Sequence, residues 1–170
     1  LSTGDNSDQA VRSADGSIVT GQWYDVAGVI DRSTGQMRLY INGQLVQSAA
    51  LRTQAAISNN QPLLIGADNE TWGAARFEGA IDTLRLWNRV LTQQEIDAGR
   101  NTPPAAGASG LVLDYRFAAS GGATLIDSGP RGLNGQTIFG LPDTTGIVVG
   151  RIATVGQKDS YSFSLASPTR

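Results

Sequence analysis

Short apolar runs that end in Gly, Asn, Asp or Ser recur along the chain, and this pattern predicts an antiparallel β-sandwich. The runs WYDVAGVI (23–30) and MRLYIN (37–42) enclose a polar loop that contains Gly35, so they predict a β-hairpin. Asn42-Gly43 is a second turn signal, and the run QLVQS follows it. These three runs are therefore expected to form a meander.

Two further runs, PLLIGA and RFEGAIDTLRLWN, also predict strands. In the second run, Ile81, Leu84 and Leu86 do not follow a single alternation of apolar and polar positions. This irregularity indicates either a β-bulge near Asp82 or a strand with both faces buried, and we favour the bulge.

One helical segment interrupts the strand pattern. Thr92 and Glu95 have the spacing of a capping box, Ile96 supplies an apolar contact, and Gly99 suits the position after the last turn. The sequence therefore predicts one short helix over residues 92–98.

The second half of the chain begins with NTPPAAGASG, a small and uncharged stretch that predicts a linker. The runs GLVLDYRF, TLID and QTIFG then predict three short strands, and IVVGRI and SYSFSL predict two strands paired across a polar turn. The chain is expected to divide into segments 1–101, 102–110, 111–141 and 142–170. Because two strands cannot make a sandwich of their own, we expect the last segment to add little stability to the others.

Composition restricts the kinds of partner. The chain has 170 residues, of which 40% are hydrophobic and 16% charged, which suffices for at least one core. A net charge of −2, with Lys158 as the sole lysine, offers no electrostatic basis for nucleic-acid binding. No run approaches the ~18 apolar residues of a membrane span. We therefore expect neither a nucleic-acid partner nor a membrane span.

The chain contains no cysteine and no histidine. This excludes disulfides, zinc sites with thiolate or imidazole ligands, Ser-His-Asp triads and cysteine nucleophiles within the chain. Any metal ion must therefore be bound by oxygen atoms.

The candidate ligand-binding residues are Trp72, Asn69 and Glu70, in the polar loop GADNETWGAARF. An exposed indole in such a loop can stack on a sugar ring, although it can also anchor the loop to the sheet. Trp23 and Trp87 lie in strand runs and are expected in the core.

Oxygen-bearing side chains gather in the same loop, where Asp68 joins Asn69 and Glu70. Calcium prefers carboxylate and amide oxygens in loops, but the spacing does not match an EF-hand, so a solvated turn is the alternative. Asp127, in DSGPRGLNG, is a further candidate that can either hold a turn through the backbone or ligate a metal.

Three segments carry resemblances to known families. GQWYDVAGVIDRSTGQMRLYINGQLV, PLLIGA and FEGAIDTLRLWNRVLTQQEI resemble the C-terminal half of a laminin G-like, concanavalin A-like jelly roll domain. GLVLDYRFAASGGATLIDSGPRGLNGQT resembles the opening of the same family, and GRIATVGQKDSYSFSLASPTR resembles the start of a pre-peptidase C-terminal domain. The jelly roll segments thus come in reversed order. Two compatible accounts fit this order: the chain is an internal fragment of a longer protein, and residues 111–117 fold back onto the strand around residue 84, as in a circular permutant.

The resemblance implies an all-β fold, an antiparallel jelly roll β-sandwich with one short helix. Glycoside hydrolases of this superfold carry an E-x-D-x-x-E arrangement, which this chain lacks, so we expect no enzyme. The implied function is a noncatalytic adhesion or carbohydrate-binding module of a larger bacterial protein, extracellular or at the cell surface. Its partners would be a glycan, another protein or neighbouring domains. The alternatives are a structural spacer and an accessory module of a secreted hydrolase or peptidase.

The resemblance also implies a structural calcium ion. In the family, an aspartate of the final strand often binds calcium together with carbonyl groups of the turn after the first strand, which assigns these roles to Asp82 and residues 117–122. Here Ala118 and Ala119 stand where the family usually has acids. The alternative is that Asp82 accepts backbone N–H groups at the bulge.

Overall fold

The structure is a computed structural model that describes residues 10–52, 63–66, 77, 79–117, 124–138, 147–150 and 160–166. All strand pairings among the named elements are antiparallel. The strands are β1 (Trp23–Asp31), β2 (Gln36–Ile41), β3 (Gln44–Ala50), β4 (Leu63–Ile65), β5 (Ala80–Trp87), β6 (Leu111–Arg116), β7 (Thr124–Leu125), β8 (Gly135–Ile138), β9 (Ile147–Gly150) and β10 (Ser160–Ala166).

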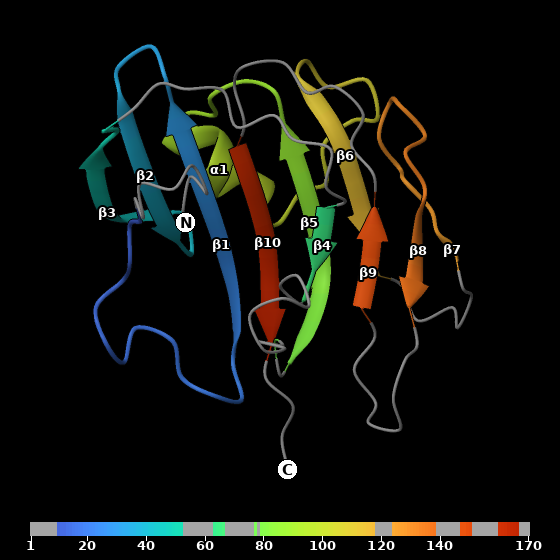
Figure 1. The fold of residues 1–170 in the computed structure, drawn as a ribbon, viewed down its shortest axis with the longest axis horizontal. Coiled ribbons are helices and arrows are strands. Elements are labelled where there is room, and N and C mark those ends of the chain that lie inside the picture. The colour runs from blue at the N-terminus through green and yellow to red at the C-terminus, as the bar shows by residue number, and fades with distance from the viewer. Residues whose placement is uncertain are drawn as a thin grey trace.

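The strands form two sheets. The six-stranded sheet has the order β3-β2-β1-β10-β5-β6, and the four-stranded sheet has the order β4-β9-β8-β7. The helix α1 (Gln93–Gly99) lies behind the six-stranded sheet in Figure 1. The predicted fold class, an antiparallel β-sandwich with one short helix, is confirmed.

Apolar side chains form three clusters around the six-stranded sheet. One cluster joins β5 and β6 to β4 and β7, and includes Leu84, Tyr115, Ile65 and Leu125, so it holds the two sheets together. A second cluster packs α1 and the segment before it against β1, β2, β5 and β6. The third lies around β1 and β2, and includes the buried Met37. In the described part of the chain, no helix has the length and hydrophobicity that crossing a bilayer requires.

The predicted meander of β1, β2 and β3 is confirmed, together with its two turns. In the first turn, Gly35 has a φ of 65°. In the second, Asn42 and Gly43 have φ values of 50° and 77°, and two successive residues with positive φ are typical of a tight hairpin turn. A side chain at position 43 would overlap the Asp97 side chain of α1. The glycine therefore allows both the turn and the close approach of the helix.

The β-bulge predicted near Asp82 is also confirmed. Along β10, Phe163 and Leu165 are separated by one residue, but their partners on β5, Leu84 and Ile81, are separated by two. The extra residue of β5 therefore falls at Asp82 and Thr83. This irregularity explains why the apolar positions of the strand do not alternate.

The capping box predicted at α1 is present. The Thr92 hydroxyl accepts a hydrogen bond from the Glu95 N–H, and the Glu95 carboxylate accepts one from the Thr92 N–H. The helix extends through Gly99, and Arg100 in right-handed conformation is the C-cap, so the glycine ends the helix rather than following it.

Strands β5 and β6 pair with Leu84 opposite Tyr115. This is the pairing that residues 111–117 make if they fold back onto the strand around residue 84. The division of the chain at residues 101, 110 and 141 stays a prediction.

The expected pairing of the two C-terminal strands with each other is wrong. Strand β9 pairs with β4 and β8, whereas β10 lies between β1 and β5 in the six-stranded sheet. Residues 147–150 therefore belong to the four-stranded sheet and residues 160–166 to the six-stranded sheet, instead of starting a separate sheet. The expectation that the last segment adds little stability rested on a separate sheet, so these pairings reverse it. The difference has a physical reason: an alternating pattern predicts a strand but carries no information about its partner.

Candidate functional site

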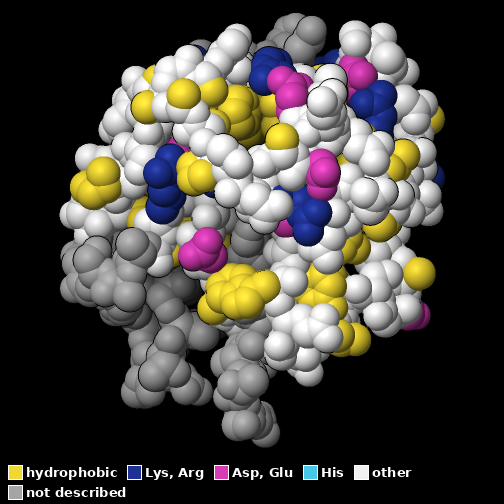
Figure 2. All heavy atoms as spheres, turned by 180° about the vertical axis from the view of Figure 1, so that it is seen from behind, with side chains coloured by type: hydrophobic (Ala, Val, Ile, Leu, Met, Phe, Trp, Pro, Cys, Tyr) yellow, Lys and Arg dark blue, Asp and Glu magenta, His cyan; other side chains and the backbone are white. Residues whose placement is uncertain are grey.

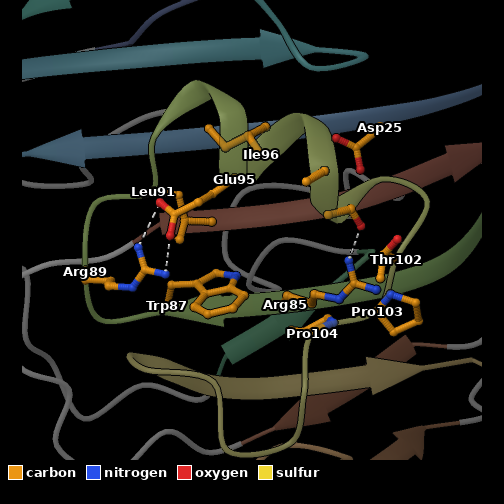
Figure 3. A pocket seen from close by; sticks show the side chains of 12 residues that line it. Asp25, Arg85, Trp87, Arg89, Leu91, Glu95, Ile96, Thr102, Pro103 and Pro104 are labelled. Carbon is orange, nitrogen blue, oxygen red and sulfur yellow. Dashed lines mark hydrogen bonds and ion pairs between the residues drawn. The ribbon is translucent and has the colours of Figure 1, made fainter.

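A pocket lies between α1 and the six-stranded sheet (Figure 3). Its volume is about 260 Å³. Trp87 and Arg85 come from β5, Asp25 comes from β1, and Leu91 and Ile96 come from α1 and the segment before it. The remaining lining residues are Arg89, Glu95, Ala98, Gly99, Thr102, Pro103 and Pro104. All of the lining residues except Asp25 therefore come from one stretch of the chain, residues 85–104.

Trp87 is 8% exposed, which confirms its expected place in the core. Its indole Nε1 is buried and has no hydrogen-bond partner among the described residues. The Arg89 guanidinium lies over the ring, 5.4 Å from its centroid, in a cation–π contact. The indole is thus held in place on one side while its N–H group remains unsatisfied.

Arg89 is fixed by several acceptors. Its Nη2 and Nη1 donate to the two Glu95 carboxylate oxygens at 2.7 and 3.0 Å, and its Nε donates to the Ser109 carbonyl at 2.8 Å. The hydrogen bonds from Arg89 and from the Thr92 N–H lower the pKa of Glu95 to about 2. Glu95 is therefore ionised at neutral pH and neutralises Arg89.

Arg85 is neutralised from the opposite side. Its Nε donates to Asp114 Oδ1 at 3.1 Å, and its Nη1 donates to the Gly99 carbonyl at the end of α1, at 2.9 Å. Asp114 is fully buried, and its Oδ2 also accepts a hydrogen bond from Arg116 Nη2 at 2.6 Å. This buried network links β5, β6 and the C-terminal end of α1.

Asp25 is the remaining acid of the pocket. Burial raises the pKa of its carboxyl group, against the lowering effect of Arg100 and Arg85. No described group donates a hydrogen bond to this carboxyl group, although the Asp25 backbone N–H donates to Asn42 Oδ1 at 3.0 Å. The lining of the pocket therefore includes a half-buried hydrogen-bond acceptor.

Trp23 corrects an expectation, because it is 56% exposed and not part of the core. It is the first residue of β1, and side chains two residues apart on a strand point to the same face, so it lies on the same face as Asp25. Ile18 and Val19, each 46% exposed, precede it in the chain, and the Val19 N–H donates to the Tyr24 hydroxyl. Exposed apolar side chains therefore lie both in the segment before β1 and at the first residue of β1.

Figure 2 shows the molecule from the side of α1. Basic and acidic side chains lie next to one another on this side, with apolar side chains between them, and no large area carries a single sign of charge. This distribution suits a neutral partner better than a strongly charged one.

Asp127 is 7% exposed and holds a turn. Its Oδ1 accepts the backbone N–H groups of Asp114 and Gly129 at 2.9 and 2.7 Å, and its Oδ2 accepts that of Leu133 at 2.9 Å. Of the two interpretations of this residue, the structure shows the turn-holding one. Metal ligation by Asp127 stays a prediction.

We expect Asp127→Asn to lower the free energy of unfolding by about 1–3 kcal/mol. The NH2 group of asparagine replaces one accepting oxygen of the carboxylate, so at least one backbone N–H group loses its hydrogen-bond acceptor. The loss should be equal in calcium and in a chelator, measured by thermal unfolding. Asp15→Asn, at an exposed turn, is the matched control and should change little. A loss that appears in calcium but not in the chelator would show instead that Asp127 ligates the metal.

Asp82 is exposed, so burial does not explain its place among apolar residues. Its Oδ2 accepts a hydrogen bond from the Thr83 hydroxyl at 3.0 Å, and its backbone carbonyl accepts the Phe117 N–H. No described backbone N–H donates to the carboxylate. The bulge places this side chain outside the core.

The other candidate residues, Asp68, Asn69, Glu70 and Trp72, lie outside the described residues, as do residues 118–122 of the predicted calcium site. Within the described ranges, no three acidic side chains converge in a way that could hold a metal ion.

The sequence did not indicate the pocket beneath α1. Its residues, apart from Asp25, lie between residues 85 and 104, but each has an ordinary local explanation: Trp87 as a core residue, Glu95 as a cap and Pro103 as part of a linker. One local signal of the pocket was available in the sequence. Trp87 and Arg89 are two residues apart, and residues two apart in an extended segment point to the same face.

Comparison with known proteins adds the family. Residues 1–97 match the laminin G-like family model described as the concanavalin A-like lectin/glucanases superfamily. The chain is also similar to the sushi, von Willebrand factor type A, EGF and pentraxin domain-containing protein 1 of Rattus norvegicus and of Mus musculus, with 30% and 29% identity over 120 residues. The match covers 66% of this chain and 3% of each relative. No solved structure matches the chain significantly. The chain belongs to the concanavalin A-like lectin/glucanases superfamily, as a laminin G-like member.

Proposed function

We propose that this domain is a noncatalytic module of a larger extracellular protein, and that it binds carbohydrate through the exposed aromatic surface at the start of β1. Domains of this family are typically adhesion or carbohydrate-binding modules. The observation that supports binding here is the 56% exposure of Trp23, since indoles are normally largely buried.

The surface has the features of a sugar platform. A flat indole offers a large apolar area at a low cost in conformational entropy, and the apolar face of a pyranose can stack on it. The mixed charge of this face leaves no strong field that would favour a polyanion (Figure 2).

A noncatalytic role fits two acids near the pocket, Glu95 and Asp114. Glu95 is ionised and paired with Arg89, and Asp114 is buried between two arginines. Glycoside hydrolysis needs two carboxyl groups about 5–10 Å apart across the sugar, one of them protonated. These two acids are both held in ion pairs, which does not favour the role of a general acid.

Calcium remains a proposal, with three separate sets of candidate ligands: Asp82 with residues 117–122, Asp127, and Asp68 with Asn69 and Glu70. The comparison of unfolding in calcium and in a chelator, applied to Asp68→Asn, tests it, because an ion bound only to the native state raises stability. The bacterial origin stays a prediction as well.

A glycan array tests the proposed function directly. We expect the wild-type chain to bind a defined set of glycans, and Trp23→Ala to bind them at least about tenfold more weakly, since buried tryptophan contacts commonly contribute 2 kcal/mol or more. Leu45→Ala is the matched control, because Leu45 is 47% exposed but lies on β3.

Two results would contradict the proposal in different ways. Binding to no glycan would favour the structural spacer. Equal binding by wild type and Trp23→Ala would place the site elsewhere on the domain.

A further inference from the structure

Trp23 and Asp25 are two residues apart on β1, so their side chains point to the same face of the strand, about 7 Å apart along it. The pairing of β1 with β10 has no register shift from Trp23 to Val29, so the alternation of faces is regular here. Trp23 is 56% exposed, whereas Asp25 is half-buried and lines the pocket beneath α1. An exposed indole therefore lies beside the pocket.

Asp25 lines an open end of the pocket. Figure 3 shows Asp25, Thr102 and Pro103 together near the C-terminal end of α1. Thr102 and Pro103 are exposed, so this end of the pocket is accessible from solvent. No described group donates a hydrogen bond to the Asp25 carboxyl group. The open end therefore offers an acceptor that an incoming N–H or O–H group would satisfy.

The rest of the pocket is apolar and small. Leu91 and Ile96 are buried, and Pro104 lies opposite the helix as a further apolar wall. The volume of about 260 Å³ lies just below the ~300–1,000 Å³ of drug-sized ligand pockets, so it suits one aromatic side chain better than a larger molecule. The indole of tryptophan combines a flat apolar body with one N–H donor at its edge.

The charges of the pocket favour a neutral group of this kind. Arg85 is paired with Asp114 at 3.1 Å, and Arg89 is paired with Glu95 at 2.7 Å. Both guanidinium groups also donate to backbone carbonyls. Because these positive charges are already compensated, a phosphate or carboxylate would gain little here.

One copy of the chain carries both halves of such a contact. Tryptophan is among the residues that most often anchor protein interfaces by filling a pocket on the partner. Because Trp23 and Asp25 share one face, a two-fold axis close to them brings each Trp23 to the pocket of the other copy, and the same contact is made twice. An aromatic side chain buries ~150–250 Å², so two such insertions form a small interface of the transient kind.

We propose that two copies of this chain associate across a two-fold axis, with Trp23 of each copy inserted into the pocket of the other and its indole N–H donating to the Asp25 carboxyl group there. The inference goes beyond the proposed function and does not rest on it. Since Trp23 cannot contact a glycan and fill a pocket at once, a glycan bound at Trp23 competes with the second copy. At the low concentrations of a fluorescence measurement, a transient dimer dissociates and Trp23 is exposed.

Sedimentation equilibrium of the full chain, over protein concentrations from ~1 µM to ~1 mM, tests the association. We expect a reversible monomer–dimer equilibrium for the wild type. Trp23→Ala should weaken it at least about thirtyfold, because each dimer loses both anchors. Asp25→Ala should weaken it as well, by a smaller factor. Leu45→Ala is the matched control, since Leu45 is 47% exposed but lies on β3, and it should leave the equilibrium unchanged.

A mixing experiment shows whether the two halves of the contact meet. Thr102→Phe places a bulky side chain at the exposed rim and should close the pocket without disturbing the core. Trp23→Ala and Thr102→Phe should each be monomeric alone. When they are mixed, Trp23 of the Thr102→Phe copy can enter the open pocket of the Trp23→Ala copy, so a mixed dimer with one of the two contacts should form. Unchanged melting temperatures of both variants show that they are folded.

Three results overturn the proposal: the wild type stays monomeric over the whole range, Trp23→Ala dimerises as tightly as the wild type, or the mixture associates no more tightly than each variant alone. The first result would leave the pocket to a different occupant. No glycan is present in these measurements, so a monomeric wild type does not affect the glycan array, and a chain that binds no glycan can still dimerise.

Discussion

Removal of residues 142–170 is expected to lower the melting temperature by at least about 10 °C or to abolish cooperative unfolding. Strand β10 pairs with β1 from Trp23 to Val29 and with β5 from Ala80 to Trp87. Without it, both strands lose a neighbour and expose unpaired backbone groups in the middle of the sheet. A loss of several kcal/mol corresponds to a shift of this size in a chain of this length.

A point variant tests the same pairing without a large deletion. Ser162 lies opposite Ala27 on one side and Arg85 on the other, so Ser162→Pro should destabilise strongly, because proline cannot donate to a ladder in a central strand. Ser48→Pro on the edge strand β3 is the control and should cost less, since the Ser48 N–H donates to the Gln47 side chain. An unchanged melting temperature after the deletion would show that residues 142–170 do not complete the sheet.

Asp114→Ala is expected to lower the free energy of unfolding by about 3–5 kcal/mol, because it leaves Arg85 buried without its counter-charge. The side chain of Arg85 is 12% exposed, so water cannot fully replace the lost carboxylate. Such a loss is a large fraction of the ~5–15 kcal/mol that stabilises a typical domain. Chemical denaturation measures this loss directly, provided that the slope of unfolding free energy against denaturant concentration is the same in wild type and variant.

The control is Asp97→Asn, which breaks the exposed ion pair with Arg100 and should cost about 1 kcal/mol or less. A combined variant, Arg85→Met with Asp114→Leu, should recover much of the stability, because it removes both buried charges. If Asp114→Ala costs no more than Asp97→Asn, the buried network does not hold the sheet together as described.

Much of the fold could be predicted from local sequence signals. The turn at Asn42-Gly43 needs positive φ at both residues, and the capping box at Thr92 and Glu95 pairs donors and acceptors within one turn. The bulge at Asp82 was visible as a break in alternation. These features depend on neighbours in the sequence, so the sequence reports them directly.

Features that depend on distant neighbours were not predictable in the same way. The pattern SYSFSLA indicates a strand, but its insertion between β1 and β5 follows from which edges remain unpaired in the folded sheet. Trp23 belongs to a strand pattern, but its exposure depends on where it lies along β1, at the first residue. The pocket requires Asp25 of β1 to meet Trp87 and Glu95, which lie much later in the chain.

Acrylamide quenching of variants that retain a single tryptophan tests most directly whether Trp23 forms the binding surface. We expect Trp23, at 56% exposure, to be quenched several-fold more efficiently than Trp87, at 8%, and to become protected when a glycan found on the array is added. The matched variants carry phenylalanine at the other two tryptophan positions. Quenching of Trp23 as weak as that of Trp87, or no protection of Trp23 by a bound glycan, would contradict the assignment of this surface as the carbohydrate site.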